Sequence, residues 1–219
     1  MSLYEERKRL EQEDGEPLHT LRVTPDSEVA VQCNSAGVLV VAGEGGLTKD
    51  LEERIVKPLA EFGYFVVAID LVRDRPATID PSLAINDIAA AMLYLKELAG
   101  GKLGVIGFDA AAGVVMEAAT QLPQIDCVVV AGGSGPRKGT RLNRVRCSIL
   151  VHRGTKSSPL TDAIRKELLE RIQPAMQTLM VQDYDASGGF FAHPVDDEER
   201  DYATEAFDHT TSFLSQNLI

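Results

Sequence analysis

The chain has 219 residues, a formal net charge of −11 and a sequence pI near 4.8. This acidic balance argues against nucleic acid or an anionic membrane as the main partner, and no apolar run reaches the length of a membrane span. The cysteines Cys33, Cys127 and Cys147 lie in or beside apolar runs, which is typical of reduced thiols in a cytoplasmic protein. Without CxxC pairs or Cys/His pairs at ligand spacing, we expect no metal and no cofactor.

Residues 1–16 are densely charged and predict a leader, either a short surface helix or a frayed segment. From residue 17 the apolar pattern becomes periodic, which predicts a single domain over 17–219. Apolar or alternating runs predict strands over 18–24, 28–33, 37–42, 64–69, 103–107, 125–131, 147–152 and 178–184. Segments of helical period predict helices over 48–62, 81–98, 110–121, 160–172 and 198–218.

The regular alternation of strands and helices predicts an α/β fold with a mostly parallel, doubly wound sheet flanked by helices. The run over 37–42 is apolar throughout, as expected of a strand buried on both faces. The segments that follow the strands are too short for a large lid.

Residues 103–119 read LGVIGFDAAAGVVMEAA, an apolar strand that breaks at Gly107 and continues as an alanine-rich helix. This is the outline of a nucleophile elbow, the strand-to-helix turn of α/β-hydrolases that lifts one side chain to the top of the sheet. Asp109 stands at its apex. The start of a helix stabilises a carboxylate anion there.

Over residues 18–217 the chain resembles the dienelactone hydrolase family. The resemblance rests on residues 37–71, with the stretch LAEFGYFVVAID, and on Gly107-Phe108-Asp109 at the place of the family's Gly-Phe-Cys. It also rests on residues 184–191, which precede the C-terminal helix where the family carries its histidine loop. The resemblance implies an α/β-hydrolase fold with a nucleophile, an acid, a histidine and an oxyanion hole.

Carried over residue by residue, the resemblance places Asp109 where the family has Cys or Ser. The acid is expected within 154–159, around Ser157, where this chain has no carboxylate. The histidine is expected at Gly189, or at Gly188 if the loop is one residue shorter. The triad is therefore expected to be degenerate at all three positions.

The resemblance also implies an oxyanion hole made by the backbone N–H of Ala110 and one from the loop of Glu44. A second interpretation pairs the carboxylates of Glu44 and Asp109 so that they share a proton, as an acid/base arrangement. The alternative is that Glu44 lies on a solvated loop.

An aspartate at an elbow is compatible with catalysis. In haloalkane dehalogenases and epoxide hydrolases such an aspartate attacks carbon, and a histidine-activated water then hydrolyses the alkyl-enzyme ester. His193, a few residues beyond the expected histidine position, is the candidate for this water activator; the alternative is a solvated loop residue. His152, at a strand end, is a weaker candidate, with a hydrogen-bonded structural histidine as the alternative.

The most unusual charge feature is PRKGTRLNRVR over 136–146, with five cations and no acid in an acidic chain. It follows the strand after the elbow, and Arg73 follows the strand over 64–69. We therefore expect Arg73 and Arg137 at the carboxyl edge of the sheet, where open α/β sheets bind ligands, as groups that hold an anionic substrate. The alternative is a solvated basic loop offset by nearby acids.

Three functions follow from these observations. The first is a hydrolase that acts on a small anionic ester, lactone or alkyl compound through Asp109 and His193. The second is a catalytically inactive homologue that binds a small ligand or a partner, and the third is a carboxylate acid/base activity of isomerase type. The expected partner is a small molecule, with a homodimer as one further hypothesis.

Overall fold

The computed structural model describes residues 3–10, 17–25, 34–43, 45–72, 80–156, 159–172 and 178–219. The strands are β1 (Tyr4–Leu10), β2 (Leu18–Thr24), β3 (Gly37–Ala42), β4 (Phe65–Asp70), β5 (Leu103–Phe108), β6 (Cys127–Ala131), β7 (Ser148–Lys156) and β8 (Leu179–Ser187). The helices are α2 (Lys49–Leu51), α3 (Lys57–Glu61), α4 (Pro81–Leu98), α5 (Ala110–Ala118), α6 (Asp162–Ile172) and α7 (Asp197–Leu218). A π-helical turn, Glu52–Val56, joins α2 to α3, and a 3₁₀ turn, Leu142–Arg144, precedes β7.

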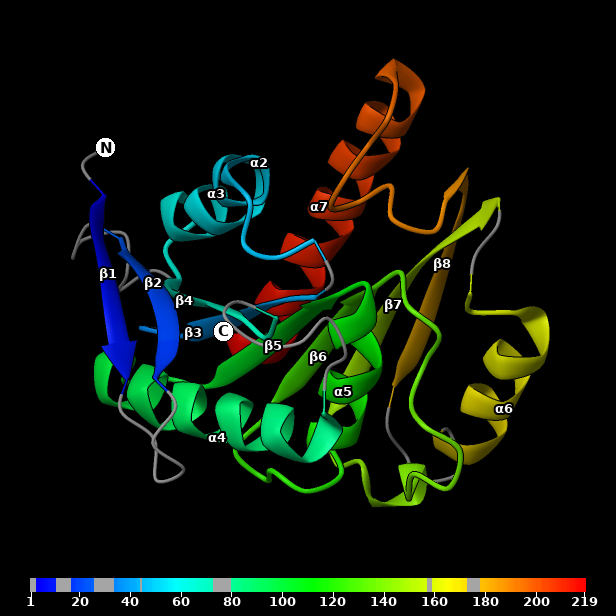
Figure 1. The fold of residues 1–219 in the computed structure, drawn as a ribbon, viewed down its shortest axis with the longest axis horizontal. Helices are drawn as coiled ribbons and strands as arrows, with labels where there is room; N and C mark the ends of the chain where they lie inside the picture. Colours follow the sequence, from blue (N-terminus) through cyan, green and yellow to red (C-terminus); the bar gives the residue numbers. More distant parts are fainter. Residues whose placement is uncertain are drawn as a thin grey trace.

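The strands form one sheet in the order β1-β2-β4-β3-β5-β6-β7-β8 (Figure 1). From β4 through β8 neighbouring strands are parallel, whereas β2 is antiparallel to β4 and β1 is antiparallel to β2. The predicted mostly parallel sheet flanked by helices is confirmed. The carboxyl ends of the parallel strands consequently meet at one edge.

Two apolar layers hold the sheet between its helices. One layer packs α4, α5 and α6 against one face, and the other packs the helix of residues 49–61 together with α7 against the opposite face (Figure 1). Every residue of β3 is buried, as its uninterrupted apolar run predicts. Cys127 and Cys147 are buried and free, and burial raises the pKa of both thiols. Cys33 lies outside the described residues.

The short helix or frayed leader expected over residues 1–16 is wrong for Tyr4–Leu10, which forms β1 at the edge of the sheet. Its side chains are mostly exposed, so it lacks the apolar alternation by which a strand is usually predicted. Ion pairs, rather than buried apolar side chains, hold this strand: Glu6 pairs with Arg22, and Arg7 pairs with Glu52. An edge strand with five charged side chains also resists pairing with other chains.

Two strands extend beyond their predicted ends, and a third predicted strand is not among the described residues. The strand expected over 28–33 lies outside the described residues. β7 and β8 continue past their expected ends, to Lys156 and Ser187, with an irregular register at Gly154. A Cβ at Gly154 would lie 1.8 Å from the carbonyl oxygen of Ser187, so this approach of the two strands requires glycine.

Candidate active site

β5 ends directly below a strained residue. Asp109 has φ 49° and ψ −122°, a backbone conformation that non-glycine residues rarely adopt, and α5 begins at the next residue. The turn is held by the Asp109 N–H, which donates to the Ala131 carbonyl, and by close packing at Gly107, where a Cβ would lie 2.7 Å from Val115. This geometry is that of a nucleophile elbow.

Glycines surround the Asp109 carboxylate. A Cβ at Gly132, which has φ +74°, would lie 2.9 Å from Asp109 Oδ1, and one at Gly189 would lie 3.5 Å from the same atom. Gly189 is the position at which the family resemblance places a histidine. Its Cβ direction points at the elbow carboxylate, and apart from its chain neighbours no other heavy atom of the described residues lies within 4 Å of that position.

His193 reaches the elbow from the loop after β8. Its Nε2 lies 3.7 Å from Asp109 Oδ2, a distance of ion-pair range and longer than a hydrogen bond. The loop is held in shape by two N–H groups, of Ala192 and His193, which donate to the Gly189 carbonyl. The ring also lies against Gly45, where a Cβ would be 2.6 Å from Nε2. Thus the structure brings the elbow and His193 together.

Glu199 fixes the loop that carries His193, and sequence reasoning missed it. Its carboxylate is buried and accepts hydrogen bonds from the Ser187 N–H at 2.7 Å and the Val195 N–H at 3.1 Å. Burial opposes its ionisation, but these two backbone donors outweigh it and hold the pKa of Glu199 below its ordinary value. One side chain of α7 therefore secures both ends of the loop.

Gly43, directly after β3, lies against the first turn of α5. The first N–H groups of α5 face Gly43, where a Cβ would lie 2.9 Å from both the Ala110 and the Ala111 nitrogen. Ala110 and Gly45 line the same cleft as Asp109. Glu44 lies outside the described residues.

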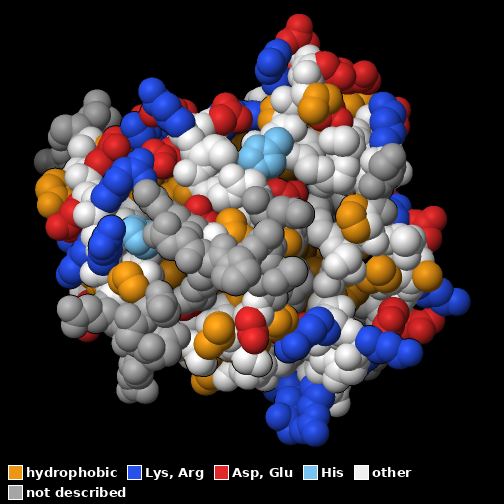
Figure 2. Space-filling model, in the orientation of Figure 1, with side chains coloured by type: hydrophobic (Ala, Val, Ile, Leu, Met, Phe, Trp, Pro, Cys, Tyr) orange, Lys and Arg blue, Asp and Glu red, His pale blue; other side chains and the backbone are white. Residues whose placement is uncertain are grey.

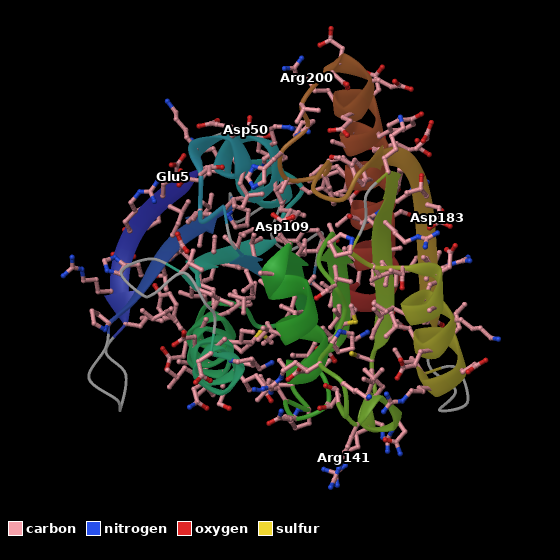
Figure 3. The ribbon with its side chains drawn as sticks, turned by 45° about the vertical axis from the view of Figure 1, so that its right-hand side comes forward. Glu5, Asp50, Asp109, Arg141, Asp183 and Arg200 are labelled. Carbon is pink, nitrogen blue, oxygen red and sulfur yellow. The ribbon has the colours of Figure 1, made fainter. Side chains whose placement is uncertain are left out.

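An open cleft of about 630 Å³ surrounds the elbow. Figure 3 places Asp109 at its end of α5, near the top of the sheet. Besides Asp109 and His193, the described lining consists of Gly45, Ala110, Gly133, Ser134, Pro159, Ser187, Gly188 and Gly189, with neither Lys nor Arg among them. The described lining is therefore made mostly of small residues, and Asp109 and His193 are its only ionisable side chains.

The structure does not bring Arg137 to this cleft. Gly113 allows the loop after β6 to lie against α5, because a Cβ there would be 2.3 Å from the Gly135 carbonyl oxygen. The loop then follows α5 away from the elbow, and Arg137 binds the buried Glu117 through its Nε and Nη2 atoms. Arg73 and Ser157 lie outside the described residues.

His152 is a buried structural residue on the opposite face of β7 from Arg153. Its Nδ1 lies 3.1 Å from the Tyr184 hydroxyl, and its Nε2 lies 2.9 Å from Thr210 Oγ1. The Tyr184 hydroxyl is also within hydrogen-bond distance of His209 Nδ1, at 2.9 Å. Burial lowers the pKa of His152 to about 3, with a further contribution from His209. The hydrogen-bonded alternative for His152 thus describes its position better than the water-activating one.

The mixed sheet, with a strained turn that presents one side chain above the carboxyl ends of its parallel strands, defines an α/β-hydrolase. Residues 19–218 match the model of the dienelactone hydrolase family, and the chain belongs to that family. Within the described residues no helix has the length and apolar character needed to cross a bilayer, and no group of three or more His, Cys, Asp or Glu side chains is arranged to hold a metal ion.

Solved structures show the same fold over all or nearly all of the chain. A dienelactone hydrolase-like promiscuous phosphotriesterase from metagenomic libraries matches with a TM-score of 0.81 and 17% identity, covering 100% of both chains. An esterase from Pyrococcus furiosus has a TM-score of 0.76 and 16% identity, covering 98% of this chain and 93% of its own. An α/β-hydrolase from a Medee basin deep-sea metagenome has a TM-score of 0.75 and 15% identity, covering 97% of each chain. No curated protein sequence matches the chain.

Proposed function

We propose that this member of the family hydrolyses a small molecule at a polarised carbon, with Asp109 as nucleophile and His193 as the base that activates water. The observation that carries the proposal is the 3.7 Å separation of His193 Nε2 and Asp109 Oδ2 at the apex of a strained elbow. Suitable substrates are an alkyl halide, or an ester or lactone attacked at its alkyl carbon.

The first step forms an alkyl ester. An Asp109 carboxylate oxygen attacks the substrate carbon, and the bond to the leaving group breaks with its electron pair. A carboxylate is better suited to this displacement than to attack on an acyl carbon, because attack on an acyl carbon would form a reactive anhydride.

The second step hydrolyses that ester. His193 takes a proton from water, whose oxygen adds to the Asp109 carboxyl carbon, and the Ala110 N–H stabilises the resulting oxyanion. Collapse expels the product alcohol, which takes the proton back from His193. The Asp109 carboxyl group then loses its proton to solvent and regains its charge.

The charged groups around the cleft bear on whether the substrate is neutral or anionic. The expectation of an anionic substrate depended on Arg73 and Arg137, and Arg137 is bound to Glu117 outside the cleft. The described lining contains Asp109 and no cation, which favours a neutral substrate over an anionic one. We therefore propose a neutral small molecule as the first class to test.

The test combines kinetics with mass spectrometry of the intact protein after incubation with short haloalkanes, activated esters and lactones. In Asp109→Asn we expect turnover to fall by about 10³-fold or more. In His193→Ala we expect a comparable loss together with an alkyl adduct that accumulates on Asp109, since its hydrolysis lacks the base. His19→Ala and Asp201→Asn, which change residues outside the cleft lining, are the matched controls.

A second candidate, an inactive homologue that binds a ligand, is favoured by one observation. Gly189 offers no side chain at the point from which a histidine would face the elbow. Absence of turnover and of any adduct across the panel, with both variants identical to the parent protein, would favour this candidate and contradict the hydrolase. Turnover that requires Asp109 without any adduct would instead favour the acid/base activity.

A further inference from the structure

The basic run of residues 136–146 lines two adjoining hollows that the proposed reaction does not use. One has a volume of about 480 Å³ and contains Arg137, Lys138, Arg141 and Arg144. The other, of about 320 Å³, contains Arg144 and Arg146. The hollows adjoin, because both are lined by Arg144 and by Thr120 and Gln121 after α5, and we treat them together. We call them the basic groove.

Alternating burial makes the cations project outward. Leu142 and Val145 are buried in the core, whereas Arg141, Arg144 and Arg146 are exposed. Figure 3 shows Arg141 pointing away from the body of the molecule at the end of α5 opposite to Asp109. Figure 2 shows lysine and arginine side chains gathered along this lower edge. The two buried apolar side chains thus hold this segment so that its arginines are exposed to solvent together.

The charges in the groove are not balanced by acids. Its described lining has five cations and two carboxylates, Glu117 and Asp126. Glu117 is occupied by Arg137, and Asp126 accepts the Leu103 N–H. Among the described residues, no acidic side chain forms an ion pair with Arg141, Arg144 or Lys138, although the molecule carries a net charge of −11. Clustered cations repel each other, so their concentration here lowers stability unless an anion binds.

The groove is also held in place. Arg137 donates four hydrogen bonds to Glu117, one of them from its backbone, and Arg171 of α6 donates to the Thr140 carbonyl. The turn between them closes with the Thr140 N–H bonded to the Arg137 carbonyl, and Gly139 has φ +93° with open space beside it. The loop that presents the cations is therefore anchored at both sides.

We propose that the basic groove binds a small polyanion, a metabolite-sized molecule that carries phosphate groups or several carboxylates. Its volume suits a small molecule, and arginine forks bind phosphate and carboxylate in pairs of hydrogen bonds. The C-terminal end of α5 disfavours an anion, so binding depends on the exposed cations themselves. The site lies at the other end of α5 from the elbow, about 13 Å along a helix of nine residues.

The test is calorimetric titration of the full chain with inorganic tripolyphosphate at about 50 mM salt, where surface charges are weakly screened. Arg141→Ala/Arg144→Ala removes two exposed cations of the groove. Lys49→Ala/Lys166→Ala removes two exposed cations elsewhere and is the matched control. We expect binding of one tripolyphosphate per chain, weakened at least about 30-fold in the first variant and less than about 2-fold in the control. Citrate in place of tripolyphosphate separates carboxylate from phosphate ligands.

Equal weakening in both double variants, or several weak sites per chain, would show a general charge effect and overturn the proposal. Failure of both probes to bind would overturn it as well. Self-association of the chain alone that is lost in Arg141→Ala/Arg144→Ala would assign the groove to a second copy and equally contradict a small-molecule site. None of these results bears on turnover at Asp109, so the two proposals fail independently.

Discussion

Replacing Glu199 with glutamine tests how the His193 loop is held. The carboxylate accepts the Ser187 and Val195 N–H groups, one on each oxygen. Glutamine keeps one acceptor and turns an N–H donor toward the other amide, so one buried backbone donor loses its partner. Loss of one charge-assisted bond and weakening of the second should lower the free energy of unfolding by about 2–3 kcal/mol.

The assay is urea unfolding of the parent, Glu199→Gln and Glu198→Gln. Glu198 is the exposed neighbour on the same helix, and its replacement should change the free energy of unfolding by less than about 0.5 kcal/mol. Amide hydrogen exchange should accelerate at Ser187 and Val195 in Glu199→Gln alone.

The pH dependence has a definite sign. The pKa of Glu199 lies below its usual 4.5 in the folded state, so its contribution is complete above about pH 4.5 and is lost as the pH falls through the folded value. Glu199→Gln should remove this part of the acid destabilisation. Equal losses for Glu198→Gln and Glu199→Gln, or unchanged exchange at the two amides, would refute the reasoning.

Three other changes test the surrounding structure. In an Asp109→Ser background, Gly189→His should raise the rate of hydrolysis of an activated phenyl ester by about 10-fold or more over Asp109→Ser alone, because the added histidine would face the elbow. If the double variant folds but hydrolyses the ester no faster, a side chain at residue 189 does not face the elbow. Since the pKa of His152 falls from 6.5 to about 3 on folding, stability should be complete above pH 6.5 and decline toward pH 3, by about 1.4 kcal/mol per unit at most. His152→Gln should remove that slope, as followed by thermal unfolding across the range. Arg137→Ala should lower the melting temperature by several degrees because Glu117 stays buried without its partner, whereas Arg141→Ala should leave it nearly unchanged.

The central sheet could be predicted because its signal is local. Strands such as β3, buried on both faces, appear in the sequence as uninterrupted apolar runs, and helices between them follow from periodicity. β1 escaped prediction because cross-strand charges and pairing to β2 stabilise it, and neither is visible within its own seven residues.

In the site, the elbow spacing located Asp109, and loop position alone suggested His193. Glu199 could not be found this way, since its partners are backbone N–H groups twelve and four residues away. Arg137 was predicted at the cleft but lies elsewhere, because the close approach of Gly113 and Gly135 sets the direction of the loop after β6. The loop therefore runs along α5 away from the elbow. Contacts of this kind are set by tertiary packing and leave little trace in composition.

The charges at the two ends of α5 are opposite in sign and match the dipole of the helix, and each end belongs to a different proposed site. Asp109 stands at the positive N-terminal end, which stabilises its anion, and the cations of the basic groove lie near the negative C-terminal end. Glu117, near that same end, is on the unfavourable side of the dipole, and its four hydrogen bonds from Arg137 offset this. Asp109 has a strained backbone and is surrounded by glycines. Its side chain is 24% exposed and lies beside His193. The proposed reaction at the elbow and the proposed anion site in the basic groove therefore lie at opposite ends of the same helix.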